Sequence, residues 1–99
     1  MKKSYKADRI NNALKQAISE IIQEEILGYS PDNFITVMYV IASPDLSKAD
    51  VYVSALKDID NVVEMLNKRA PYIRHLIGQK LKLRRLPQLK FIKDEYKLI

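Results

Sequence analysis

The chain has 99 residues, of which 47% are hydrophobic and 29% charged, and its formal net charge is +5. This length suits one domain with a single core. The absence of cysteine excludes disulfides and thiolate metal sites and suits a reducing cytoplasm. No apolar stretch approaches the roughly 20 residues of a membrane span, and no apolar run follows the first lysines as in a secretory signal. We therefore expect one cytoplasmic domain over residues 1–99, with flexible ends at 1–6 and 95–99.

Apolar residues recur at helical spacing from Ile10 to Ile22, with polar residues between them. This pattern predicts an amphipathic helix of about five turns that ends near Leu27. Gly28 is placed to end the helix in a left-handed conformation, and Pro31 prevents its continuation.

Two strands are predicted to follow the first helix. Residues 34–41 are rich in β-branched and aromatic side chains, and residues 49–55 alternate between apolar and polar as in a half-buried strand. The Ser-Pro-Asp turn signal between them leaves only a short connection, which predicts an antiparallel pair. In this alternation Tyr52 points away from the core, where Tyr39 or Phe91 could be its cross-strand partner.

Helical spacing returns in the second half of the chain, with Asp58 or Asp60 as the candidate cap. Pro71 interrupts this pattern, because proline disfavours helical geometry at the preceding residue and is accepted at the start of a new helix. The predicted kink consists of Ala70, Pro71 and Tyr72. A second short helix follows, and a last strand over 88–92 begins after Pro87.

The predicted order is therefore helix, strand, strand, helix, kink, helix, strand. A three-stranded amphipathic sheet with helices on one face makes a two-layer α+β domain. The part strand–helix–helix–strand is the minimal unit of the KH RNA-binding fold, and the helix and strand ahead of it give the order of the prokaryotic type. We therefore predict a KH-like domain.

Basic residues are concentrated in two parts of the chain. Residues 67–93 contain nine basic residues and no acid, and the first fifteen residues contain five basic residues and one acid. Residues 16–66, in contrast, contain two lysines and nine acids. Lysine and arginine bind phosphate through charge, and arginine adds a planar fork. Two such blocks can form a positive surface, whose commonest partner is nucleic acid, although a single surface lysine is usually only solvated. The predicted RNA-binding residues are Lys6, Arg9, Arg69, Arg74, Lys80, Lys82, Arg84 and Arg85.

No set of residues in the sequence suggests catalysis or a metal site. His75 is the only histidine and has no neighbouring acid. Glu24 and Glu25 are adjacent, so their side chains diverge by about 100° on a helix and cannot form a carboxylate pair. Gly28 and Gly78 stand alone and form no phosphate-binding loop. We therefore expect no enzymatic activity, no metal and no cofactor.

Three stretches resemble the ribosome-binding factor A family. Residues 9–25 begin with Arg-Ile and contain most of the predicted first helix, and residues 43–54 are similar to that family's run D-L-x-x-A-x-V-Y-V-S. The third stretch consists of residues 70–74 and then 83–94, and the latter are similar to the family's run L-R-x-x-P-E-L-x-F-x-x-D, with Gln88 in place of glutamate. The stretches fall in the family's order and extend over nearly the whole chain.

The kink is where the sequence departs from that family, which usually has Ala-x-Gly at this bend. Tyr72 replaces the glycine, and Pro71 is expected to make the bend instead. A backbone approach to RNA that needs a glycine is therefore in question at this point.

The resemblance implies a KH-type assembly factor for the small ribosomal subunit that has no catalytic activity. Such a factor binds ribosomal RNA during late maturation and rRNA processing, near the future decoding centre, and leaves with the help of an assembly GTPase. It would act by binding one RNA conformation better than another. The implied partners are the small subunit, its ribosomal RNA and the GTPase, and we expect a monomer without membrane contact.

Two other functions stay open on the residues alone. One is a general single-strand RNA-binding KH domain without ribosomal specificity, which would bind short oligonucleotides as tightly as subunits. The other is a protein-interaction module that uses the basic face and holds its partner at salt concentrations that abolish RNA binding.

Overall fold

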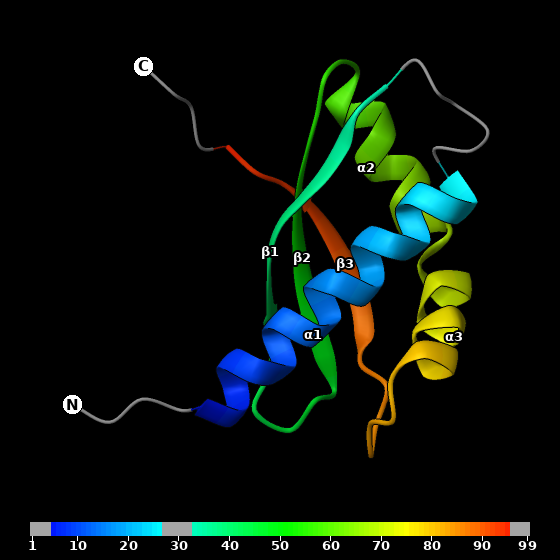
Figure 1. Cartoon of the computed structure of the whole chain (residues 1–99). Coiled ribbons are helices and arrows are strands. Elements are labelled where there is room, and N and C mark those ends of the chain that lie inside the picture. Colours follow the sequence, from blue (N-terminus) through cyan, green and yellow to red (C-terminus); the bar gives the residue numbers. More distant parts are fainter. Residues whose placement is uncertain (1–4, 27–32, 96–99) are drawn as a thin grey trace.

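The computed structural model describes residues 5–26 and 33–95 and shows seven consecutive elements (Figure 1). The elements are α1 (Tyr5–Ile21), the single π-helical turn η1 (Ile22–Ile26), β1 (Ile35–Ala42), β2 (Lys48–Ala55), α2 (Ile59–Lys68), α3 (Ala70–Lys80) and β3 (Gln88–Lys93). Their order confirms the predicted one. The predicted helix terminator Gly28 lies outside the described residues, as do most of the expected flexible ends, whereas residues 5 and 6 belong to α1.

The three strands form one mixed sheet in the order β1-β2-β3. β1 pairs with β2 in antiparallel orientation, as predicted, and β3 pairs with β2 in parallel orientation. The parallel pair needs a crossover connection, and α2 and α3 supply it. Figure 1 shows the three helices on one face of the sheet, so the predicted two-layer α+β architecture is confirmed.

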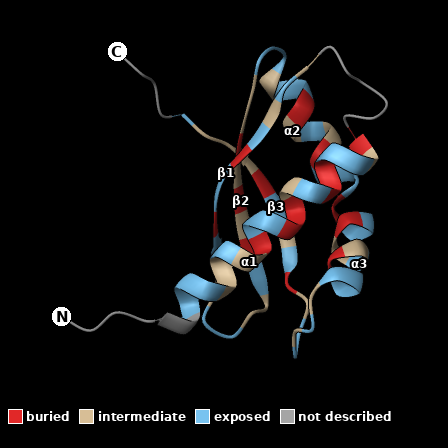
Figure 2. Ribbon diagram, viewed as in Figure 1, coloured by how far each residue is buried: buried red, intermediate tan, exposed pale blue. Residues whose placement is uncertain are grey.

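The core lies between the sheet and the helices, where the buried residues of both layers face each other (Figure 2). Its largest fully buried side chains are Leu14, Ile18, Ile21 and Ile22 from α1 and η1, Leu66, Ile73 and Ile77 from α2 and α3, and Val51, Val53 and Phe91 from the strands. Burying each such aliphatic or aromatic side chain contributes about 1.5–3 kcal/mol. The apolar stripes of the predicted helices therefore form the core.

β1 departs from simple alternation. Its register with β2 shifts between Val37 and Tyr39, so Met38 and Tyr39 are both exposed. Such a β-bulge adds one residue to a strand and turns the following side chains over. Tyr39 thereby stacks on Tyr52, with ring centroids 4.5 Å apart and an interplanar angle of 17°. The prediction of Tyr39 as a partner of Tyr52 is confirmed, whereas Phe91 lies in the core.

At each edge strand of the sheet, an asparagine side chain from a helix bonds to the backbone of one residue. The backbone N–H of Ala42 donates to Asn11 Oδ1 at 2.9 Å on the β1 edge. On the β3 edge Asn67 Nδ2 donates to the carbonyl of Phe91 at 3.0 Å, and the Phe91 N–H donates to Asn67 Oδ1 at 2.8 Å. These bonds satisfy edge groups that could otherwise pair with another strand. The Asn11 bond also fixes the N-terminal part of α1 beside the end of β1.

The junctions around α2 match the prediction fully in one case and in part in the other. Arg69 is at once the C-cap of α2 and the N-cap of α3, and Pro71 lies in the first turn of α3, which confirms the kink. The capping prediction for α2 is confirmed in position but not in its hydrogen bond. Asp58 is the N-cap residue, but its backbone is left-handed (φ 57°, ψ 43°) and its side chain makes no cap hydrogen bond. The carboxylate of Asp60 instead lies 3.2 Å from Lys93 Nζ.

Candidate nucleic-acid interface

At one end of the molecule three segments that are distant in sequence come together. They are the first turns of α1, the β1–β2 turn (43–47) and the segment between α3 and β3 (81–87), and they enclose an open groove of about 1100 Å³. Arg9 lines the groove from α1, and Arg84 and Arg85 line it from the 81–87 segment. We call it the basic groove. It unites one arginine of the first basic block with two of the second.

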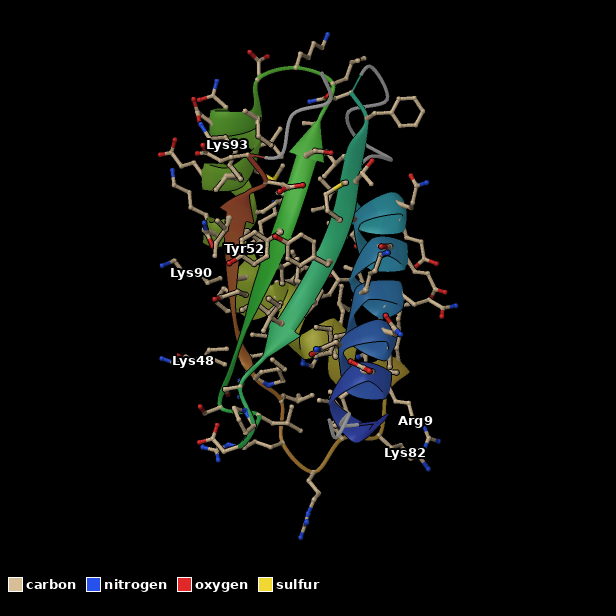
Figure 3. All side chains as sticks on the ribbon, turned by 90° about the vertical axis from the view of Figure 1, so that its left-hand side faces the viewer. Arg9, Lys48, Tyr52, Lys82, Lys90 and Lys93 are labelled. Atoms are coloured by element: carbon tan, nitrogen blue, oxygen red, sulfur yellow. The ribbon has the colours of Figure 1, made fainter. Side chains whose placement is uncertain are left out.

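The arginines of the basic groove are available for a ligand. All three are exposed, and within the described residues none of them forms an ion pair within 4.0 Å. Lys82 is also exposed, and Figure 3 shows it projecting at the same end of the molecule and in the same direction as Arg9. Exposed guanidinium groups that form no close ion pair remain able to bind phosphate.

One acid, Asp45, lines the groove on the side of the β1–β2 turn. Its Oδ1 accepts hydrogen bonds from the Ser47 backbone N–H at 3.0 Å and from the Ser43 hydroxyl at 2.9 Å. The backbone bond from Ser47, followed by the serine hydroxyls and the charge of Arg85, lowers the pKa of Asp45 from its ordinary value of 3.8 to about 2. The carboxylate is therefore ionised at neutral pH and bound within the turn.

The same turn holds Leu46 in a left-handed backbone conformation, with φ 60°. The Leu46 N–H donates to the Ser43 carbonyl at 2.9 Å, and the bonds around Ser43 and Ser47 close the turn on either side. This conformation costs a residue with a Cβ atom on the order of 1 kcal/mol and persists only where the surroundings enforce it. The result is an apolar side chain that lines the groove.

Arg74 was predicted to bind RNA, and the structure gives it an internal role. Its Nη2 donates to the Leu86 carbonyl at 2.7 Å, and its Nε donates to the carbonyls of Leu86 at 3.0 Å and Pro87 at 3.1 Å. The guanidinium fork thus fixes the 81–87 segment against α3. Arg74 is a positioning residue for Arg84 and Arg85, and its own contact with RNA stays a prediction.

Gly78 assists Arg74 in holding this segment. A Cβ atom at Gly78 would lie 2.9 Å from Leu86 Cδ1, closer than such atoms approach in proteins. The missing side chain lets Leu86 pack directly on α3. Sequence reasoning overlooked this role because an isolated glycine in a helix carries no signal of the distant residue that packs on it.

Lys80 lies near one acid of α1 and one of η1. Its Nζ lies 3.2 Å from Glu20 Oε1 and 3.6 Å from Glu24 Oε1. The hydrogen bond with Glu20 is the largest cause that raises the pKa of Lys80. The two acids come from the acidic part of the sequence, so the bridge joins α1 to α3 and offsets the charge of a predicted RNA-binding residue.

The kink lies apart from the basic groove. It precedes α3 and the 81–87 segment follows α3, so the eleven residues of this helix separate them by about 16 Å. Arg69 is exposed there and lines a small hollow of about 320 Å³ together with Glu64. Tyr72 is 47% exposed, and its hydroxyl donates to Glu25 Oε1 at 3.4 Å. The structure does not bring Arg69 and Tyr72 together with the arginines of the groove.

The remaining basic residues occupy other positions. The side chain of Lys6 lies outside the described part of the structure. Figure 3 shows Lys48, Lys90 and Lys93 projecting on the opposite side of the sheet from Arg9. Lys93 pairs with Asp60 at the start of α2. These lysines therefore do not extend the basic groove.

The described residues form no candidate metal site. They contain no group of three or more histidine, cysteine or acidic side chains that could hold a metal ion. No helix in the described part of the chain is long and apolar enough to cross a membrane. The arrangement at the groove, with basic walls and apolar residues between them, is suited to binding a polyanion.

Comparison with known proteins identifies the family. A family model described as ribosome-binding factor A matches residues 6–97. The chain belongs to this family. Family members are non-enzymatic assembly factors of the ribosome. The resemblance seen in the sequence, including the match over its N-terminal helix and its last strand, is thereby confirmed.

Individual relatives show the extent of the similarity. Ribosome-binding factor A of Staphylococcus epidermidis is 32% identical over an alignment of 95 residues, and the match covers 93% of this chain and 81% of that protein. The corresponding protein of Alkalilimnicola ehrlichii is 37% identical over 94 residues, covering 87% of this chain and 68% of its own.

Solved structures of the family share the fold. The crystal structure of ribosome-binding factor A from Thermus thermophilus matches with a TM-score of 0.78 and 27% identity, over 90% of this chain and 97% of that one. A homology model of the Thermus thermophilus protein has been fitted into a cryo-EM map of a complex with the 30S subunit. It matches with a TM-score of 0.71 and 28% identity, over 92% of this chain and 93% of that one. The predicted KH-like fold is therefore confirmed.

Proposed function

We propose that this protein binds the small ribosomal subunit through ribosomal RNA and acts in late maturation and rRNA processing. The observation that carries the proposal is the convergence of Arg9, Arg84 and Arg85 on one groove although they come from opposite ends of the chain. The Thermus thermophilus relative, whose complex with the 30S subunit has been visualised, supports the choice of partner.

The groove arginines and Lys82 would recognise the positions of phosphates in one RNA conformation. Arginine holds two phosphate oxygens in a fixed plane, so the spacing of the arginines selects among RNA shapes. A protein that binds one conformation better shifts the RNA toward it by mass action, without catalysis. In this role the protein acts in the cytoplasm as a monomer, near the future decoding centre, and departs with the help of an assembly GTPase.

Cosedimentation with free small subunits, large subunits and whole ribosomes tests the proposal. We expect selective migration with free small subunits that survives physiological salt. If Arg9, Lys82, Arg84 and Arg85 each contact one phosphate, log affinity falls by roughly 2.8 to 3.6 per decade of salt. Equal binding to all particles that vanishes with salt would reduce the function to general RNA binding.

A pair of charge-reversal variants locates the contact surface in the same assay. Arg84→Glu/Arg85→Glu should abolish migration with small subunits, because both arginines line the groove. The matched control is Lys57→Glu/Lys68→Glu, which changes the net charge equally at two exposed sites away from the groove. Equal losses in the two variants would show that only net charge matters and would contradict the role of the groove.

A further inference from the structure

We propose that the basic groove seats one unpaired nucleotide of RNA, with its base against Ile10 and Leu46 and its flanking phosphates on Arg9, Arg84 and Arg85. The inference rests on the proposed function, since it names the RNA element that the same site would recognise. It adds a chemical requirement that phosphate binding alone lacks, namely a base that is free of its helix.

The lining of the groove favours a base over bare backbone. Besides the arginines, the groove is lined by the apolar residues Ile10 on α1, Ala42 at the end of β1, and Pro44 and Leu46 in the turn. None of these four is fully buried, so a ligand can reach them. Paired bases are stacked inside a duplex and cannot cover such a surface, whereas an unstacked base gains by leaving water.

The dimensions are also sufficient for a nucleotide. A volume of about 1100 Å³ slightly exceeds the roughly 300 to 1,000 Å³ that is common for small-molecule sites. This volume is therefore sufficient for a base together with the sugar-phosphate on either side of it. Guanidinium planes can additionally stack on the base, as they do in other single-stranded RNA sites.

The charged residues of the groove lie on different walls according to their sign. The three arginines lie on α1 and on the 81–87 segment, whereas the ionised Asp45 lies on the β1–β2 turn. The carboxylate repels phosphate from the turn side and accepts hydrogen bonds from N–H groups on the edge of a base. Phosphates therefore belong on the arginine walls, and the base belongs next to the turn.

The strained backbone at Leu46 fits this arrangement. A backbone φ of 60° is uncommon in residues other than glycine, asparagine and aspartate. At Leu46 the hydrogen bonds among Ser43, Asp45 and Ser47 enforce it. Strain of this kind is retained where a side chain must be presented in one direction. In this protein it presents an apolar wall to the groove.

Three RNA hairpins of equal stem sequence test the proposal with the unmodified protein. One is fully paired, one carries a single bulged adenosine, and one carries the same bulge without its base. The two bulged hairpins have equal charge, so their difference isolates the base. We expect the intact bulge to bind roughly tenfold more tightly than the abasic one, because stacking of one base on protein side chains typically adds affinity of this order. Equal affinity for the two bulged hairpins would overturn the proposal.

A variant of the turn assigns the effect to the groove. Leu46→Asn keeps the number and branching of the side-chain heavy atoms and tolerates the left-handed backbone, so the fold should persist, as thermal unfolding can verify. It should remove the tenfold preference for the intact bulge and leave affinity for the paired hairpin unchanged. The matched control is Leu56→Asn, at an exposed leucine outside the groove, which should retain the preference.

The outcomes separate this inference from the proposed function. Equal weakening of all three hairpins by Leu46→Asn would contradict the nucleotide site even where the protein still migrates with small subunits. Failure of the unmodified protein to migrate with small subunits would instead overturn the proposed function. A preference for the intact bulge that persists in Leu46→Asn would place the base at another surface and would also overturn the inference.

Discussion

The basic groove and the helix kink both carry predicted RNA-binding residues, but their surroundings differ. In the groove three exposed arginines face apolar side chains, and the single acid is held within its own turn. At the kink Lys68 lies 3.9 Å from Glu64, and the hydroxyl of Tyr72 bonds to Glu25. The two regions therefore differ in how many unpaired cations lie together: three arginines line the groove, whereas at the kink Lys68 is paired and Arg69 alone has no ion pair within 4.0 Å among the described residues.

The comparison also changes the role expected of the kink. In ordinary KH domains a glycine-containing loop at this position brings the backbone close to nucleic acid. Here Tyr72 occupies the bend, and its side chain contacts the end of the first helix. The account therefore assigns RNA binding to the groove and a structural role to the kink.

The largest effect is expected from the residue that positions the groove. Arg74→Lys should lower the free energy of unfolding by about 1.5–3 kcal/mol, because lysine cannot reproduce the three bonds to the Leu86 and Pro87 carbonyls. Affinity for small subunits should fall about tenfold as the 81–87 segment loosens. Urea unfolding and cosedimentation measure the two quantities. A simple phosphate contact would instead keep both nearly unchanged, since the charge is retained.

A smaller effect is expected from giving the kink the glycine of its relatives. Tyr72→Gly should cost about 1 kcal/mol of stability, because glycine is unfavourable within a helix. Affinity for small subunits should stay within about twofold, since the account places the RNA elsewhere. Urea unfolding and the same binding assay check both values. A marked gain in affinity would show that the backbone of the kink reaches RNA and would contradict the assignment.

Lys80 provides a test at a basic residue that is already engaged. Lys80→Met retains most of the apolar stem and removes the contacts with Glu20 and Glu24. Because partly exposed ion pairs contribute little, we expect a slight loss of thermal stability and no measurable change in affinity for small subunits. Thermal unfolding and cosedimentation test this expectation. A loss of affinity as large as that of a groove variant would mean that Lys80 leaves its acids to bind RNA.

The smallest effect concerns Asp45 and appears only in acid. Its folded pKa of about 2 lies below the ordinary 3.8, so the ionised carboxylate stabilises the turn above about pH 4, and this contribution is lost as pH falls toward 2. Between pH 5 and 8 the turn should not change. Nuclear magnetic resonance of the Asp45 carboxyl and the Ser47 amide across pH 1.5 to 5 would follow the titration. Asp45→Asn is the control that should abolish it, and titration near 3.8 would contradict the turn geometry.

Most of the fold could be predicted from local patterns in the sequence. The helical and alternating periods indicated the order of the elements, and Pro71 indicated the kink, because these signals depend on neighbouring residues. The bulge near Met38 and the left-handed backbone of Asp58 could not be predicted. Both depend on contacts with residues elsewhere in the fold, which override local preferences.

The site was predicted only in composition. The charge blocks indicated basic residues, but three facts required the structure: the grouping of Arg9 with Arg84, the bonds of Arg74 to backbone carbonyls, and the bridge from Lys80 to an acid sixty residues away. Backbone acceptors leave no trace in a sequence, and distant charges pair only once the chain has folded. The clearest missed signal was Leu46, which lies in the run shared with the family.

Hydrogen–deuterium exchange of the protein with and without free small subunits tests the central claim most directly. The account predicts slower exchange in residues 7–11, 42–47 and 82–86, which surround the basic groove, and unchanged exchange in residues 68–73 at the kink. Protection confined to the kink, with the groove segments unchanged, would contradict the account.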